Sequence, residues 1–342
     1  MPLTEHYLVN MNKSIEYLKK FVPQSVKLKV KDVRLRRRAN KFYDTIRTYQ
    51  NKRFSDLTEE EMELASFIKN NPIAMLPYEY TKRYDAEEVV VYFDNVCNMK
   101  YVLHDNKRLY FPEKESCYSH VFDDNTIRKY YSTLLKEQDV NSPHRYESAG
   151  VHVQAGDVVA DIGAAEGIFA LSVIDKVKKV YLFEVLEEWV AALKMTFGPW
   201  KEKVVIVNKY VSNISENDFT TLDDFLGHNE INFIKADIEG SELDLLQGAR
   251  NILATRRNLR VALCTYHHVD HAESARSILA SNEFLTEFSN GYIVSVWEFD
   301  GSHFDIVLQK CNYITEFDKG NVIPLWDYAP FFRKGVIRGR KV

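Results

Sequence analysis

The sequence lacks three features that would place it in a special class of protein. Its four cysteines, Cys97, Cys117, Cys264 and Cys311, show none of the paired spacing of a zinc site or a disulfide framework. No run of about 18 apolar residues is present, the length that a membrane-spanning helix needs. The first residues, MPLTEHYLVNMNKSIEYLKK, contain no apolar stretch typical of a signal peptide. We therefore expect reduced thiols, no membrane partner and a cytoplasmic location.

An excess of positive charge is also missing. The chain has 45 basic and 49 acidic residues, a net charge of -4, so no overall field attracts a nucleic-acid backbone. Nucleic acid is therefore not an expected partner. The arginines at 34–38 are interleaved with Leu35 and Ala39, which is typical of a solvated helix face. The remaining composition, 45% hydrophobic and 27% charged, is that of a globular protein.

Residues 1–150 are predicted to form a helical and β-hairpin region that caps the protein or recognises the acceptor. Residues 55–70 and 124–138 carry apolar side chains at helical spacing. Residues 87–112 consist of short β-rich runs separated by Asn and Asp, as in consecutive hairpins.

From residue 151 to 310, strands alternate with helices. This alternation predicts an α/β fold with a Rossmann-like, mostly parallel sheet. Residues 291–309 read as two strands that supply an antiparallel edge. Residues 311–342 are then a C-terminal extension that packs near the acceptor site.

The strongest local signal is the string VVADIGAAEG at 158–167, in which an apolar strand turns through glycines into a helix. Glycines let a ligand approach the backbone closely. A dinucleotide-binding loop would read G-x-G-x-x-G, whereas this loop reads G-x-x-x-G, which argues against an NAD-dependent oxidoreductase. Acidic residues on both sides of the loop fit a cationic ligand better than a pyrophosphate. S-adenosylmethionine is such a cationic ligand, because it carries an ammonium and a sulfonium. The predicted cofactor loop comprises Asp161, Gly163, Ala164, Ala165, Glu166 and Gly167.

Two further strands end in charged residues. Glu184 closes the strand VYLFEV, where a carboxylate is placed to accept hydrogen bonds from ribose hydroxyls. Lys235, Asp237 and Glu239 end the strand in FIKADIEGSELDLLQGA and alternate onto one side of it, at the sheet edge where α/β proteins bind ligands. Glu242 and Asp244 follow in a first helical turn, where they favour the helix dipole.

Together, DIGAAEG, FEV and IKADIEGSELDLLQGA resemble the motifs of FkbM-type methyltransferases. The resemblance implies a Rossmann-like fold, S-adenosylmethionine as cofactor and O-methylation of a hydroxyl, commonly on sugars. It implies that the loop and Glu184 bind the cofactor and that Asp237 and Glu239 face the transferred methyl group. Val185, Ser212 and Asp237 are further expected cofactor contacts. Many members have an Asn where this chain has Glu166.

The string RVALCTYHH ends in His267 and His268, and such an imidazole is suited to remove the proton of an acceptor hydroxyl. Asp237, Glu239 and His267 also form a set that suits Mg or Mn. Residues 137–146 (EQDVNSPHRY) precede the first parallel strand and are candidates to close over the cofactor or acceptor.

Three interpretations of the function stay open beside O-methylation of a small-molecule or glycan acceptor. They are N-methylation of another small molecule, methylation of RNA, and a non-catalytic scaffold that keeps only the fold. Self-association into a homo-oligomer is also open.

Overall fold

The computed structural model describes residues 64, 67, 75–115, 120–268, 270–294 and 332–341, all within the second of two compact units. Leu64 and Phe67 are helical, as predicted for residues 55–70. The rest of that segment, the arginines at 34–38 and most of residues 291–331 lie outside the described residues.

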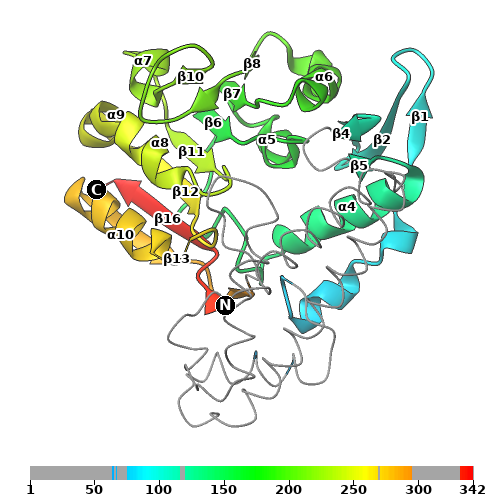
Figure 1. Ribbon diagram of the computed structural model, residues 1–342, viewed down its shortest axis with the longest axis horizontal. Coiled ribbons are helices and arrows are strands. Elements are labelled where there is room, and N and C mark those ends of the chain that lie inside the picture. Colours follow the sequence, from blue (N-terminus) through cyan, green and yellow to red (C-terminus); the bar gives the residue numbers. More distant parts are fainter. Residues whose placement is uncertain are drawn as a thin grey trace, which may run out of the picture. The chain divides into compact units, whose positions relative to one another are not determined.

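A seven-stranded sheet forms the centre of the described unit (Figure 1). Its strand order is β13-β16-β12-β11-β6-β7-β8, and the five strands from β12 to β8 are parallel. The prediction of a Rossmann-like, mostly parallel sheet is therefore confirmed. The strands are β6 (Val158–Ile162), β7 (Lys179–Phe183), β8 (Val204–Val207), β11 (Phe233–Ala236), β12 (Arg260–Cys264), β13 (Phe284–Phe288) and β16 (Val336–Lys341).

The antiparallel strand is not where the sequence placed it. β16, assigned above to an extension outside the domain, lies between β12 and β13 and pairs antiparallel with both. β16 contains basic residues and yet lies inside the sheet. Arg338, only 7% exposed, can be buried there because it donates hydrogen bonds to the carbonyls of Glu147 and Phe288. Within residues 291–309, the described strand β14 (Ile293–Val294) pairs with β15 (Phe332–Arg333) and not with the central sheet.

Helices cover both faces of the sheet, and each face has its own hydrophobic core (Figure 1). α5 (Ile168–Val173) and α6 (Glu187–Thr196) lie on one face. The other face carries α7 (Leu222–Leu226), α8 (Glu242–Gly248), α9 (Arg250–Thr255) and α10 (His271–Ser281). Alternate residues of each strand enter the two cores, as the period of a strand requires. Among the described helices, none has the length and apolar character needed to cross a bilayer.

The predicted hairpins and helix before residue 150 are confirmed. β1 (Tyr92–Asp94), β2 (Met99–His104) and β3 (Lys107–Phe111) form an antiparallel sheet. α4 (Asp124–Glu137) begins where the Asp123 carboxylate accepts a 2.7 Å hydrogen bond from the Thr126 amide. Rings of Phe111 and Phe122 pack on Trp189 of α6. The hairpins thus share a core with the parallel sheet.

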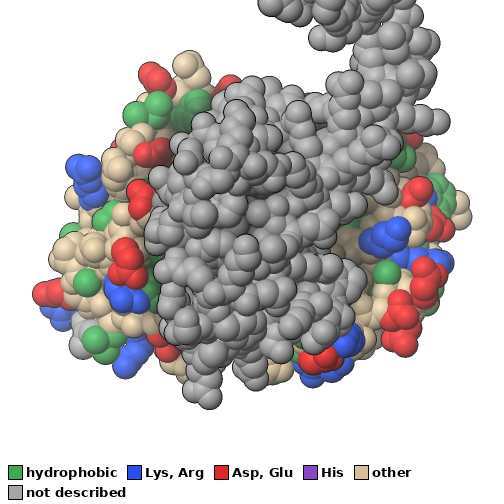
Figure 2. All heavy atoms as spheres, turned by 60° about the horizontal axis from the view of Figure 1, so that its bottom comes forward, with side chains coloured by type: hydrophobic (Ala, Val, Ile, Leu, Met, Phe, Trp, Pro, Cys, Tyr) green, Lys and Arg blue, Asp and Glu red, His purple; other side chains and the backbone are tan. Residues whose placement is uncertain are grey.

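Short elements complete the described chain. They are η2 (Glu79–Arg83), η3 (Ala86–Glu88), β4 (Lys114–Glu115), β5 (His120–Val121), η4 (Gly198–Trp200), β9 (Tyr210–Val211) and β10 (Phe219–Thr220). On the face shown in Figure 2, acidic and basic side chains are interspersed over the described surface. No continuous basic patch is visible among the described residues on that face.

Candidate active site

A cavity of about 590 Å³ opens at the carboxyl ends of β6, β11 and β12. This volume is within the range of small-molecule sites, and the carboxyl edge is where open α/β sheets bind ligands. One wall comes from α4 and the segment after it, and the opposite wall comes from the loop after β6. The polar and charged residues that line it are Lys129, Tyr130, Glu137, Gln138, His144, Tyr146, Asp161, Glu166, Lys235, Asp237, Glu239 and Tyr266.

The predicted cofactor loop forms part of this wall. Gly163 has a φ of 70°, and a Cβ there would lie 2.0 Å from the carbonyl oxygen of Asp237. Only glycine therefore allows the loop to pack against the end of β11. The amides of Gly163 and Ala164 both donate to the carbonyl of Phe183 at 3.0 Å, which ties the loop to β7. Ala165 also has a left-handed backbone, with a φ of 45°.

Lys235 contacts this loop and holds it in place. Its ammonium lies 2.9 Å from Asp161 Oδ1 and donates a 2.7 Å hydrogen bond to the Gly163 carbonyl. Burial opposes the positive charge of Lys235, but the attraction of Asp161 and Asp237 outweighs the effect of burial, so the pKa of Lys235 is raised. Asp161 is completely buried and already paired. Asp161 therefore positions the loop, whereas the sequence predicts that it attracts a cationic ligand directly.

Two carboxylates on opposite walls face the cavity. Glu166 is 5% exposed, and the Tyr130 hydroxyl donates to its Oε2 at 3.2 Å. Burial raises the pKa of Glu166 to about 7 and also raises the pKa of Glu137, at the end of α4. A ligand with positive charge would stabilise both carboxylates in their ionised form, so this end of the cavity favours a cation.

Glu184 follows β7 directly, at the strand end where the sequence predicts it. Its carboxylate accepts hydrogen bonds from the amides of Ala165, Val185 and Leu186 at 2.7–2.8 Å. It therefore ties the cofactor loop to the end of β7. Ser212 follows β9 and bonds to Thr220. The residues that line the cavity do not include Glu184, Val185 or Ser212.

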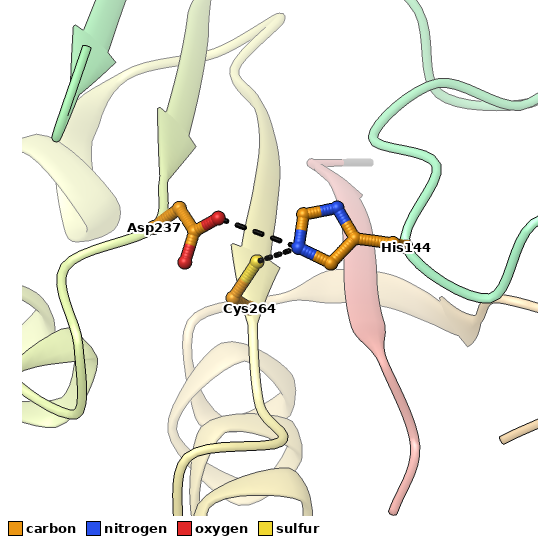
Figure 3. A group of neighbouring side chains, drawn as sticks. All are labelled: His144, Asp237 and Cys264. Carbon is orange, nitrogen blue, oxygen red and sulfur yellow. Dashed lines mark hydrogen bonds and ion pairs between the residues drawn. The ribbon is translucent and has the colours of Figure 1, made fainter. Parts of the chain in front are cut away.

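Asp237, which also lines the cavity, lies close to His144 and Cys264 (Figure 3). The Tyr146 hydroxyl donates to its Oδ2 at 2.9 Å, and His144 Nε2 lies 3.4 Å from the same oxygen. Its Oδ1 lies 3.6 Å from His267 Nε2. Although burial opposes it, the two imidazoles hold the pKa of Asp237 far below its usual range. Asp237 therefore stays a carboxylate.

Glu239 and His267 lie beside Asp237. Glu239 Oε2 is 3.5 Å from His267 Nε2, and although its side chain is 55% exposed, partial burial raises the pKa of Glu239 to about 7. Glu242 Oε1 lies 3.1 Å from His267 Nδ1, and its Oε2 lies 3.3 Å from His271 Nδ1. Although burial opposes the charge, Glu242 and Asp237 raise the pKa of His267 to about 9.

Two expectations for this region therefore need correction. Glu242 is a buried partner of two histidines, 1% exposed, and does more than favour a helix dipole. His267 is held protonated near neutral pH, which is unsuited to a proton acceptor. His268 lies over Gly240 and against the ring of His271, outside the cavity lining.

The structure thus brings together the predicted residues Asp161, Gly163, Ala164, Ala165, Glu166, Asp237 and Glu239, all in the cavity wall. Gly167, Glu184, Val185, Ser212, His267 and His268 do not line it. Segment 137–146, expected to close over the site, contributes Glu137, Gln138, His144 and Tyr146. Tyr130 in α4 and Cys264 in β12 also lie at this site, and no local signal in the sequence marks them out.

Comparisons with known proteins find similarity to methyltransferases. Residues 211–314 match the model of the methyltransferase FkbM domain. A comparison with curated protein sequences finds no significant match. A methyltransferase FkbM from Methylobacillus flagellatus is similar in structure, at 17% identity over 48% of this chain and 50% of that one, with a TM-score of 0.38. The chain thus spans half of that protein's length.

Two further structures are similar. A precorrin-6y C5,15-methyltransferase from Geobacter metallireducens has 10% identity over 56% of this chain and 84% of its own, with a TM-score of 0.35. An rRNA methylase from Streptococcus thermophilus has 14% identity over 56% of this chain and 89% of its own, with a TM-score of 0.35. Over residues 211–314, the chain is therefore similar to the methyltransferase FkbM domain.

Proposed function

We propose that this protein transfers a methyl group from S-adenosylmethionine to a hydroxyl oxygen of a small-molecule acceptor, a saccharide or a glycosylated compound. The observation that carries the proposal is the pair of carboxylates, Glu137 and Glu166, that face a 590 Å³ cavity beside the loop at Gly163. A buried carboxylate is stabilised in its charged form by a positive partner. The ammonium and sulfonium of S-adenosylmethionine supply such charge.

The residues around Asp237 support transfer to a hydroxyl. S-adenosylmethionine would supply the methyl carbon, and the acceptor oxygen would bond to it as the carbon-sulfur bond breaks and the electron pair stays on sulfur. Such a displacement gains mainly from positioning in a site that excludes water. Glu239 lines the cavity, and its pKa of about 7 suits a group that accepts the hydroxyl proton near neutral pH.

Dependence on Mg or Mn stays a prediction. Glu239 Oε2 and Asp237 Oδ1 lie 3.5 and 3.6 Å from His267 Nε2, and His267 would have to lose its proton for all three to bind one ion. An ion there would hold these side chains and polarise an oxygen. Activity that survives a chelator unchanged would contradict this prediction.

Isothermal titration with S-adenosylmethionine and S-adenosylhomocysteine tests the cofactor, with NAD as the negative control. We expect micromolar binding of S-adenosylmethionine to the wild type and at least tenfold weaker binding to Glu166→Gln. A tenfold change corresponds to a loss of about 1.4 kcal/mol of binding free energy. If the wild type binds neither S-adenosyl compound, the proposal fails and a scaffold becomes the better account.

The acceptor is tested by methyl transfer from labelled S-adenosylmethionine to separate pools of glycans, small amines and RNA. We expect the label in the glycan pool, as an O-methyl group identified by mass spectrometry. Label in the amine or RNA pool alone would contradict the saccharide acceptor and leave methyl transfer intact.

A further inference from the structure

One ring nitrogen in the cavity wall faces three heteroatoms at once. His144 Nε2 lies 3.2 Å from the Tyr266 hydroxyl, 3.4 Å from Asp237 Oδ2 and 3.8 Å from Cys264 Sγ. An imidazole nitrogen carries at most one hydrogen, which serves one acceptor well, usually at 2.7–3.2 Å. The single hydrogen on Nε2 therefore serves one of these neighbours, and the other contacts depend on the hydrogens of Tyr266 and Cys264 themselves or on a bound ion.

The 3.4 Å separation of His144 Nε2 from Asp237 Oδ2 is the one expected between two ligands of one metal ion, and the 3.8 Å separation from Cys264 Sγ is slightly longer. Around a tetrahedral zinc ion, with bonds of about 2.0 Å to nitrogen and oxygen and about 2.3 Å to sulfur, the donor atoms lie roughly 3.3–3.6 Å apart. The donor atoms of His144, Asp237 and Cys264 all lie within 4.8 Å of one another. A set of imidazole, thiolate and carboxylate suits zinc and disfavours magnesium, which prefers oxygen ligands alone.

Two strand ends and one loop supply these three side chains. Cys264 is the last residue of β12 and is completely buried, Asp237 follows β11, and His144, 2% exposed, reaches in from the segment before β6 (Figure 3). The Tyr146 hydroxyl bonds to Asp237 Oδ2 at 2.9 Å and orients the carboxylate, as supporting groups of metal sites do. His144, Asp237 and Tyr266 line the cavity, so an ion has a path to the site.

We propose that His144, Asp237 and Cys264 bind one divalent ion of the zinc class. Cys264 binds as the thiolate and its proton leaves to solvent. With three protein ligands, the fourth position faces the cavity, the arrangement of zinc sites that accept an oxygen ligand. At this end of the cavity, that ligand is water or, if the proposed function holds, the acceptor hydroxyl.

The test is titration of the chelator-treated full chain with Zn²⁺ by calorimetry and with Co²⁺ by absorption, without S-adenosylmethionine or acceptor. We expect one ion per chain and a near-ultraviolet charge-transfer band from thiolate to cobalt. Cys264→Ser should abolish the band, and both Cys264→Ser and His144→Gln should weaken zinc binding by at least about 10- to 100-fold, the effect that loss of a supporting residue alone has.

Cys97→Ser is the matched control, because this thiol lies in the hairpin region and is only partly buried. Circular dichroism of each variant establishes that it is folded. No bound ion, no thiolate band in the wild type, or a band that survives Cys264→Ser would overturn the proposal. So would binding lost in His267→Gln and unchanged in Cys264→Ser, which would place the ion on Asp237, Glu242 and His267. Because neither S-adenosylmethionine nor acceptor is present, this failure is distinct from failure of the proposed function.

Discussion

The ammonium of Lys235 and the carboxylate of Asp161 form a 2.9 Å ion pair at which both side chains are at most 5% exposed. Lys235 lies in β11 and lines the cavity, and the same ammonium donates a hydrogen bond to the Gly163 carbonyl. One buried pair thus connects β6, β11 and the loop that we assign to the cofactor.

Removal of Lys235 should destabilise the fold. Lys235→Met leaves the Asp161 carboxylate buried without its partner, which typically lowers the free energy of unfolding by about 3–5 kcal/mol. Denaturant unfolding measures the effect. The double variant Lys235→Met, Asp161→Asn should recover much of it. Lys178→Met is the control, because its ion pair with Glu230 is exposed and should leave the midpoint unchanged. Equal effects of both single variants would contradict the assignment.

Gly163 should not tolerate a methyl group. Gly163→Ala combines an unfavourable φ of 70° with a Cβ 2.0 Å from the Asp237 carbonyl. Gly156→Ala has a similar φ of 83° but no atom within 4 Å of its Cβ. The control should lose about 1–2 kcal/mol of unfolding free energy through the backbone alone. Gly163→Ala should lose about 1–3 kcal/mol more, together with cofactor binding. Equal losses would show that the contact with β11 is unimportant.

Glu184 should act on the loop before any ligand is present. In Glu184→Ala, the amides of Ala165, Val185 and Leu186 lose their acceptor, so their hydrogen exchange should accelerate in the unliganded protein. Affinity for S-adenosylmethionine should fall as well. Unchanged exchange with reduced affinity would instead favour the direct contact with ribose that the sequence predicts.

Cofactor affinity should rise with pH through the ionisation of Glu166. Burial raises its pKa to about 7 from an ordinary value of 4.5. Between pH 5.5 and 7.5, below the pKa of about 7.7–8.0 of an α-amino group, affinity should rise up to about tenfold as the carboxylate forms. Titration calorimetry measures the rise, and Glu166→Gln should remove it. A rise that persists in Glu166→Gln would assign it to another group.

The raised pKa of Glu166 lowers the stability of the unliganded protein as pH rises, whereas it raises the affinity for the cofactor. Because the folded pKa of Glu166 is raised, its contribution to stability is complete below about pH 4.5 and is lost as pH rises through about 7. The unliganded wild type should therefore lose stability over this window relative to Glu166→Gln. Denaturant unfolding at several pH values checks the sign.

Much of this protein follows from the sequence by itself. Alternating apolar runs and turn residues determine the hairpins at 92–111, helix α4 and the parallel strands, because these patterns reflect local backbone preferences. The loop from Asp161 to Gly167 and the acids at Asp237 and Glu239 are also local, since the carboxyl ends of parallel strands meet at one sheet edge.

Tertiary structure alone decided the partners of these residues. The pairing of Lys235 with Asp161, the approach of His144 to Asp237 and Cys264, and the insertion of β16 between β12 and β13 join segments far apart in the chain. No local pattern encodes such contacts, because they depend on how whole elements pack. Burial raises the pKa of Glu166, and the imidazoles of His144 and His267 keep Asp237 ionised, whereas the sequence shows both residues only as carboxylates.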